Sequence, residues 1–215
     1  IYTLNEEFNK NFKLYNFHNL YKELLNFCTV DLSSFYFDIR KDTLYCEKKD
    51  SQKRKDCIVV LNIILDCLLK WFAPILSFTT EEIYRLLNKD NGSSIHLKQF
   101  PKINQNWNNL EIQKNWNDLI HIRNAVNASI EKRREDKTIG SSLEANVKIK
   151  LDKKYFKLAS QHDFSEICIT SSAEVILDEN LKDGVEVETL KAEGEKCPVC
   201  WKISQEKCKR HGNLY

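Results

Sequence analysis

Apolar residues recur at helical spacing over most of the chain before Gly140. Between residues 5 and 28 they are separated by three to five positions, which places them on one face of an amphipathic helix. Residues 30–45 continue the pattern. We therefore expect two consecutive helices here, or one long bent helix. The first apolar face consists of Phe8, Phe12, Tyr15, Leu20, Leu24 and Phe27.

The segment 57–73 is apolar enough to raise the question of a membrane span. Its polar residues Asn62, Asp66 and Lys70 are four apart and form one narrow stripe on a helix. Inserting an Asp or a Lys into a bilayer costs about 2.5 to 3.5 kcal/mol each. The pattern therefore favours a central bundle helix, which Pro74 ends because proline disfavours helix continuation.

Two more helices are expected before Gly140. Thr79 and Glu82 have the spacing of a capping box, which predicts a helix over residues 81–87. A second, longer helix is predicted over residues 116–137 because apolar residues again recur at helical spacing. Its apolar face consists of Leu119, Ile122, Val126 and Ile130.

After Gly140 the period changes from helical to alternating. Val147, Ile149 and Leu151 alternate with lysines, which is typical of a half-buried strand. Further strands are expected at residues 167–170, 174–177 and 185–189, with a short helix at 155–160. The fold class is therefore mostly α. We expect a helical bundle over residues 1–140, a small α+β junction unit over 141–192, and a tail over 193–215.

Composition limits the class of protein but does not identify a binding partner. The 215 residues are 42% hydrophobic, and the net charge of +2 is the difference between 33 basic and 31 acidic residues. Any basic surface must therefore be local. Methionine is absent and the chain opens on Ile1 without a signal peptide, which indicates a cytoplasmic protein cut from something longer.

The cysteine pattern points to a metal site in the tail. Cys197 and Cys200 form a C-x-x-C knuckle, whose two thiolates can bind one tetrahedral zinc from the same tight turn. Cys208 and His211 form a second pair with the same spacing, so Cys3His ligation is open. A redox dithiol is the alternative, but that motif normally opens a helix after a buried strand. A structural zinc is therefore favoured.

Positive charge concentrates at the end of the long helix. Such a cluster can bind phosphates, or it can be a solvated helix end, where cations suit the helix dipole. The tail is also basic and carries an aromatic ring, the combination that a single-stranded RNA loop needs. The candidate RNA-binding residues are Arg123, Lys132, Arg133, Arg134 and Lys137 in the helix and Trp201 and Lys202 in the tail.

Four segments in order resemble one family. Residues 72–84, Phe-Ala-Pro-Ile-Leu-Ser-Phe-Thr-Thr-Glu-Glu-Ile-Tyr, are similar to the anticodon-binding domain of class Ia aminoacyl-tRNA synthetases for isoleucine, valine and leucine. Residues 31–45, 137–145 (Lys-Thr-Ile-Gly-Ser-Ser-Leu-Glu-Ala) and 194–201 (Gly-Glu-Lys-Cys-Pro-Val-Cys-Trp) resemble bacterial isoleucyl-tRNA synthetases specifically. The chain is thus identified as a C-terminal fragment of that family.

The resemblance implies a bundle that holds the anticodon stem-loop of an isoleucine-accepting tRNA. The nucleotide-binding signatures H-I-G-H and K-M-S-K-S are absent. ATP and isoleucine would therefore be used only by a catalytic domain outside this chain, and no catalytic residue is expected within it. The whole enzyme is expected to be a monomer that does not bind membranes. A related valyl or leucyl synthetase and a freestanding zinc-knuckle RNA-binding or scaffold protein remain alternatives.

One departure from the family concerns the metal. Bacterial members normally complete the knuckle with a second C-x-x-C, after a segment resembling His-Gly-Asn-Leu-Tyr, and this sequence stops at Tyr215. We therefore expect that the second pair was cut off. Cys197 and Cys200 carry over by motif as ligands, whereas Cys208 and His211 remain candidates.

Overall fold

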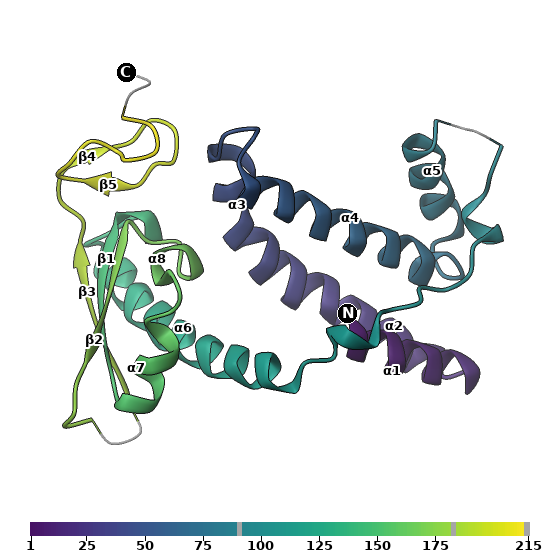
Figure 1. Cartoon of the computed structure of the whole chain (residues 1–215), viewed down its shortest axis with the longest axis horizontal. Coiled ribbons are helices and arrows are strands. Elements are labelled where there is room, and N and C mark those ends of the chain that lie inside the picture. The colour runs from purple at the N-terminus through teal and green to yellow at the C-terminus, as the bar shows by residue number, and fades with distance from the viewer. Residues whose placement is uncertain (90–91, 182–183, 213–215) are drawn as a thin grey trace. The chain divides into compact units, whose positions relative to one another are not determined.

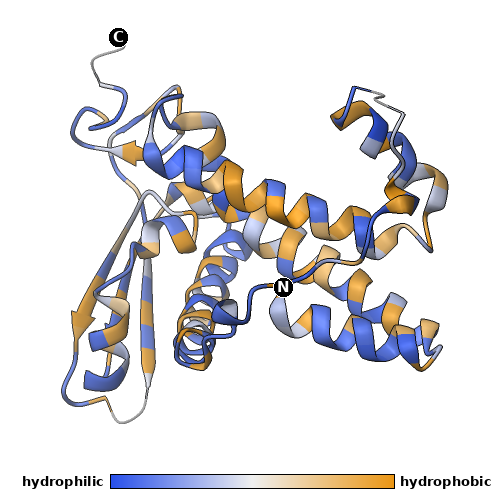
Figure 2. Ribbon diagram, turned by 45° about the vertical axis from the view of Figure 1, so that its right-hand side comes forward, coloured by the Kyte–Doolittle hydropathy of each residue, from blue (hydrophilic) through white to orange (hydrophobic). Residues whose placement is uncertain are grey.

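A computed structural model describes residues 1–89, 92–181 and 184–212. The chain divides into two compact units, Ile1–Asn108 and Asn109–Tyr215. The first is helical, and the second combines helices with small sheets (Figure 1). Apolar and polar residues are interleaved along the helices of both units, as amphipathic helices require (Figure 2).

Unit 1 opens with consecutive helices, as the spacing predicts. They are α1 (Tyr2–Lys13), α2 (Phe17–Asn26) and α3 (Phe37–Cys46), and a π-helical stretch (Phe27–Tyr36) joins α2 to α3. The buried side chains of this part include Phe8, Leu20 and Leu24 from the predicted apolar face. Tyr15 is an exception, because it follows α1 in a left-handed conformation and is 80% exposed.

Helix α4 (Gln52–Phe72) is the long apolar helix that the sequence predicts, and it ends two residues before Pro74. Its buried residues include Ile64, Cys67 and Trp71. On the polar stripe Lys70 pairs with Asp66 at 2.6 Å. Within the described part of the chain, no helix is long and apolar enough to cross a membrane.

The predicted capping box of Thr79 and Glu82 does not form. Helix α5 (Ser77–Leu87) begins before Thr79, and no side chain caps its first turn. Thr80 instead donates its hydroxyl to the carbonyl of Leu76 at 3.0 Å. Glu81 accepts hydrogen bonds from Ser94 and from the backbone N–H of Ile95, at 2.8 and 3.0 Å. Thr79 and Glu82 therefore lie inside the helix, where they do not cap its start, and the neighbouring Glu81 holds the following loop.

Two single-turn 3₁₀ helices follow α5 in unit 1. They are η2 (Ile95–Leu97) and η3 (Gln105–Trp107), and Asn104 caps the second through the backbone N–H of Asn106 at 2.9 Å. The extended residues between them pack partly on the core of the unit through Phe100 and Ile103.

Unit 2 is built on helix α6 (Leu110–Glu135), whose first turn is capped by the side chain of Asn109. The central strand β1 (Ala145–Leu151) pairs in parallel with β2 (Ser172–Leu177) and antiparallel with β3 (Val185–Lys191). A 3₁₀ turn, η4 (Ser142–Glu144), precedes β1. The predicted apolar face of α6 is buried in the core of this unit, with Leu119, Ile122, Val126 and Ile130 at most 2% exposed.

This packing changes the expected division of the chain. Residues 109–140, expected in the bundle, belong to the same compact unit as the sheet. The reason is that α6 buries its apolar stripe against the alternating apolar residues of β1, among them Val147 and Ile149. The spacing of apolar residues therefore predicted helix α6 correctly, but it did not show that α6 packs in the core of the sheet unit.

The connection from β1 to β2 contains two short helices, α7 (Lys153–Ala159) and α8 (Phe164–Ile167). The first confirms the helix expected near 155–160. The strand expected at residues 167–170 is wrong, because Asp163 caps α8 and Ile169 then takes a left-handed conformation with φ of 57°. Ile167, Cys168 and Thr170 are nevertheless buried.

Candidate metal centre and nucleic-acid interface

The C-x-x-C motif lies in the turn of a two-stranded hairpin, β4 (Glu195–Lys196) and β5 (Ile203–Ser204). The backbone N–H of Cys197 donates to the carbonyl of Lys202 at 2.9 Å. Before the hairpin, Gly194 has a φ of 119°, and a Cβ there would lie 2.2 Å from the carbonyl oxygen of Ser204. Only glycine fits this position, which closes the hairpin below the two thiols.

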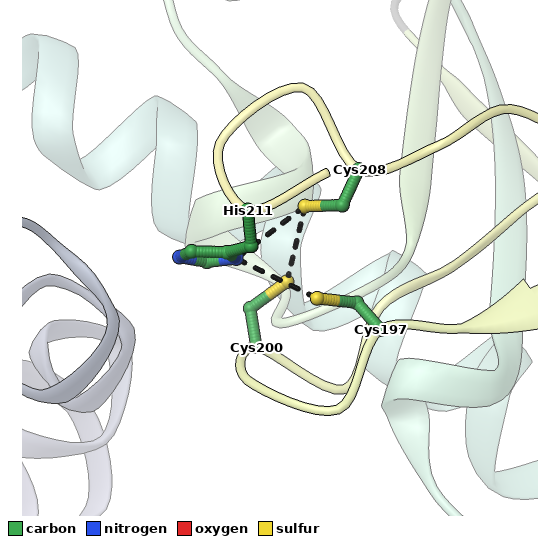
Figure 3. A group of neighbouring side chains, drawn as sticks. All are labelled: Cys197, Cys200, Cys208 and His211. Atoms are coloured by element: carbon green, nitrogen blue, oxygen red, sulfur yellow. Dashed lines mark hydrogen bonds between the residues drawn. The ribbon is translucent and has the colours of Figure 1, made fainter. Parts of the chain in front are cut away.

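A second turn brings the other pair of donors to the same place. The backbone N–H of His211 donates to the carbonyl of Cys208 at 3.2 Å, which keeps the two side chains on one side of the turn. Figure 3 shows Cys197, Cys200, Cys208 and His211 pointing toward one another. Their ligand atoms all lie within 4.8 Å of one another. The structure therefore unites the two candidate pairs in one cluster.

The spacing of the donors fits zinc. Zn–S bonds of about 2.3 Å and Zn–N bonds of about 2.0 Å in a tetrahedron require S···S and S···N separations of about 3.8 and 3.5 Å. The Sγ atoms of Cys200 and Cys208 are 3.8 Å apart. The Nδ1 of His211 lies 3.5 Å from the Sγ of Cys197 and 3.4 Å from that of Cys208. Three thiolates and one imidazole with no open position are typical of a structural site.

The two thiols of the knuckle differ electrostatically. Burial opposes ionisation of Cys197, but the backbone N–H groups of Cys200 and Val199, together with Cys200 and His211, outweigh it and lower the pKa of Cys197 to about 6. Burial and the neighbouring thiols raise the pKa of Cys200 to about 11. A metal would therefore meet one thiolate already formed and would have to displace the proton of the other.

The knuckle is tied to the rest of unit 2 through two serines that sequence reasoning missed. Lys202 donates its Nζ to the Oγ of Ser165 at 2.9 Å, and the backbone N–H of Ile203 donates to the Oγ of Ser171 at 2.7 Å. Both serines are more than 30 positions away in the chain, so no local pattern could have shown them. Lys202, a candidate RNA contact, thus has a structural partner.

Trp201 projects from the knuckle. It is 60% exposed, and its φ of 63° is in the left-handed region, which disfavours a bulky residue. The ammonium group of Lys196 lies 5.3 Å from the centre of its ring, within the range of a cation–π contact. An exposed ring beside a cation is able to stack on a base whose phosphate the cation neutralises.

The basic cluster on α6 and in the turn after it divides into two groups. Arg123 donates its Nε to the carbonyl of Ile167 at 3.0 Å, and Arg133 donates to that of Thr189 at 3.1 Å, so both brace the sheet unit. Lys132, Arg134 and Lys137 are exposed. Arg134 pairs with Glu131 at 2.8 Å on the surface, where such pairs contribute about 0–1 kcal/mol. The second group is the better placed to meet phosphates.

Known proteins resemble the chain over its whole length. Residues 1–149 match the family described as the anticodon-binding domain of tRNA ligase. A protein of Pelagibacter ubique named isoleucine–tRNA ligase is 59% identical over 213 residues, covering 99% of this chain and 23% of that protein.

More distant relatives have the same name. That of Agrobacterium fabrum is 41% identical over 199 residues, covering 88% of this chain and 20% of that protein. That of Caldicellulosiruptor saccharolyticus is 37% identical over 219 residues, covering 100% and 24%. The chain thus spans about a fifth to a quarter of the length of these relatives.

Proposed function

The chain belongs to the anticodon-binding domain family of tRNA ligases, and we propose that it is the part of an isoleucine–tRNA ligase that holds the anticodon stem-loop of an isoleucine-accepting tRNA. The family match over residues 1–149 carries this proposal. Attachment of isoleucine with ATP belongs to the remaining three quarters of such an enzyme. We further propose that this enzyme acts in the cytoplasm as a monomer.

Two surfaces of unit 2 support RNA binding. At the end of α6, the exposed side chains of Lys132 and Arg134, with that of Lys137 just after the helix, can neutralise backbone phosphates. On the knuckle, Trp201 can stack on an unpaired base beside Lys196. These residues serve the positioning and the recognition parts of the same task, since phosphate contacts orient the RNA and base contacts select it.

Charge reversal on α6 tests the phosphate contacts. In the double variant Lys132→Glu/Arg134→Glu, tRNA affinity should fall and depend less on salt, because fewer counterions are released on binding. The slope of log affinity against log salt should flatten by about 1.4 to 1.8, from about 0.7 per contact on single strands to about 0.9 on duplex. Filter binding of tRNA over a salt series measures it.

The matched control is Lys153→Glu/Lys157→Glu, which reverses two exposed charges on α7. It leaves the slope unchanged if the α6 surface is the one that meets the phosphates. Arg133 is excluded from the variant because its hydrogen bond to Thr189 would confuse a binding effect with a folding effect. Equal slopes in the wild type and the α6 variant would show that this cluster is a solvated helix end and does not contact phosphates.

We also propose that the knuckle holds one structural zinc. Cys197 and Cys200 supply two thiolates, and in the 215-residue chain Cys208 and His211 complete a four-donor shell. The zinc would fix the turns at 197–200 and 208–211 to each other and so hold Trp201 in place. A tail this short buries too little apolar surface to fold by itself, so the metal would supply much of its stability.

The chain alone should neither activate isoleucine nor form isoleucyl-tRNA. The H-I-G-H and K-M-S-K-S signatures, which the resemblance assigns to ATP binding, are absent from its sequence. Isoleucine-dependent pyrophosphate exchange should therefore stay at background, with a full-length isoleucine–tRNA ligase as the positive control. Exchange above background would show that this chain contains a catalytic site, and it would overturn the proposal that catalysis belongs to another part of the enzyme.

A further inference from the structure

A surface groove lies in unit 1, whereas the surfaces discussed so far belong to unit 2. One wall is a face of α4 that includes Val59, Asn62 and Ile63, and the other is the segment 98–107, which includes η3. The groove has a volume of about 770 Å³. Sites for small ligands typically measure about 300–1,000 Å³, so the groove is large enough for one nucleotide.

The groove is lined by both apolar and polar residues. Phe100 and Ile103 line it and also pack on the core of the unit, where Phe100 packs edge-on against Phe8 with ring centroids 4.9 Å apart. The amide side chains of Asn62 and Gln99 are exposed on opposite walls. Amides can both donate and accept, which suits the edge of a base.

The ring of Trp107 lines the groove and is not part of the hydrophobic core of unit 1. Trp107 is 49% exposed, whereas Trp71 is fully buried and Trp116 packs against the core of unit 2. The backbone N–H of Trp107 donates to the carbonyl of Asn104 at 3.0 Å, so the 3₁₀ turn fixes the backbone from which the indole projects. A positioned and exposed indole offers a face for stacking.

The charge of the groove is positive. Its lysines are Lys70, Lys98 and Lys102, and its carboxylate is Asp66, which already pairs with Lys70 at 2.6 Å. Lys98 lies 5.7 Å from the ring centre of Tyr84 and remains exposed, as does Lys102. An apolar protein segment would bury these ammonium groups without partners, which is costly, whereas a flat ligand with a negative charge would match them.

We propose that this groove binds one unstacked nucleotide of the tRNA anticodon loop, with its base against Trp107 and its phosphate near Lys98 and Lys102. Asn62 and Gln99 then face the edge of the base. The inference rests on the proposed function and adds a base-binding subsite in unit 1 to the surfaces of unit 2. Its chemistry is that of single-strand RNA recognition, in which aromatic rings take bases and lysines take phosphates.

The test is the affinity of the whole chain for an RNA stem-loop carrying the anticodon loop of an isoleucine-accepting tRNA, measured by fluorescence anisotropy. Trp107→Ala should weaken binding roughly fivefold or more, the loss that follows removal of a stacking ring. Trp107→Phe should retain most of the affinity, because a smaller ring still stacks. Phe78→Ala is the control, since Phe78 is 92% exposed and lies outside the groove.

Abasic substitutions in the loop make the test specific. Removing the base that occupies the groove should weaken binding to the wild-type chain and leave binding to Trp107→Ala unchanged, whereas other abasic positions should affect both chains equally. Circular dichroism of each variant shows that the fold is kept.

The outcomes separate the subsite from the proposed function. If Trp107→Ala binds as tightly as wild type while Lys132→Glu/Arg134→Glu binds weakly, the subsite is overturned and tRNA binding stands. If the wild type does not bind the stem-loop but binds unstructured oligouridylate through Trp107, the subsite stands and the anticodon function is overturned. Wild-type binding of neither RNA overturns both.

Discussion

Replacing Cys197 by serine is expected to abolish stoichiometric zinc binding. A serine hydroxyl does not ionise near neutral pH, so the site loses the thiolate that is the easiest to form in the free protein, with a pKa of about 6. Structural zinc sites in small domains are worth about 10–16 kcal/mol at neutral pH, so losing one of four ligands has a large effect. Inductively coupled plasma mass spectrometry of the dialysed protein should give one zinc per chain for wild type and none for the variant.

Cys28→Ser is the matched control, because Cys28 is a half-buried free thiol in unit 1 and lies outside the cluster. It should retain one zinc per chain. The loss of zinc in Cys197→Ser should also loosen the hairpin, so trypsin should cut the tail faster at Lys202 or Lys207. A zinc content near one in Cys197→Ser would exclude the knuckle as the metal site.

The third and fourth ligands can be assigned separately. In the 215-residue chain, Cys208→Ser and His211→Ala should each lose zinc, because the Sγ and Nδ1 atoms complete the tetrahedron. The family resemblance implies another set, in which a second C-x-x-C beyond residue 215 supplies them. Zinc that survives both substitutions in a longer chain, and is lost there with Cys197→Ser, would assign the site to that second pair.

Periodicity predicted the elements that bury one regular face. The residues Leu119, Ile122, Val126 and Ile130 were expected on one face of a helix, and all four are buried on α6. Val147, Ile149 and Leu151 alternate in sequence and are buried on β1. In both cases the spacing of apolar residues reports burial directly, because the geometry of each element decides which side chains share a face.

A short buried run does not carry that information. Residues 167–170 were expected to form a strand, and Ile167, Cys168 and Thr170 are indeed buried. Burial of a few adjacent residues is equally compatible with the end of a short helix, which is what the cap at Asp163 produces. The capping box failed for another reason: α5 begins at Ser77, so Thr79 and Glu82 lie inside the helix and not at its start.

The sequence showed which residue types the candidate sites contain but not which of them are committed elsewhere. Arg123 and Arg133 look like members of one basic cluster, yet they donate to carbonyls 44 and 56 positions along the chain. The approach of the Cys208 and His211 pair to the Cys197 and Cys200 pair likewise depends on how two turns pack. The arginine contacts join distant segments and have no signature in a single sequence, whereas the spacing of Cys208 and His211 made them candidates without showing that the turns meet.

Within unit 1, a large loss of stability is expected for Trp71→Ala. Trp71 is fully buried, its ring packs 6.1 Å from that of Phe8 and 6.3 Å from that of Phe27, and its Nε1 donates to the Oδ1 of Asn5 at 3.1 Å. Truncation should cost about 3–5 kcal/mol through the cavity and the lost contacts. This is a large part of the roughly 5–15 kcal/mol that stabilises a typical domain.

Urea denaturation followed by circular dichroism at 222 nm should show this cost as an earlier transition for the helices of unit 1. Trp71→Phe separates the two causes, because phenylalanine keeps most of the packing but leaves the buried Oδ1 of Asn5 without its donor, at about 1–3 kcal/mol. Trp107→Ala is the control, since that ring is 49% exposed and its removal should change stability by less than about 0.5 kcal/mol. A Trp71→Ala variant that unfolds at the urea concentration of wild type would show that α1 and α4 do not share the core formed by Phe8 and Trp71.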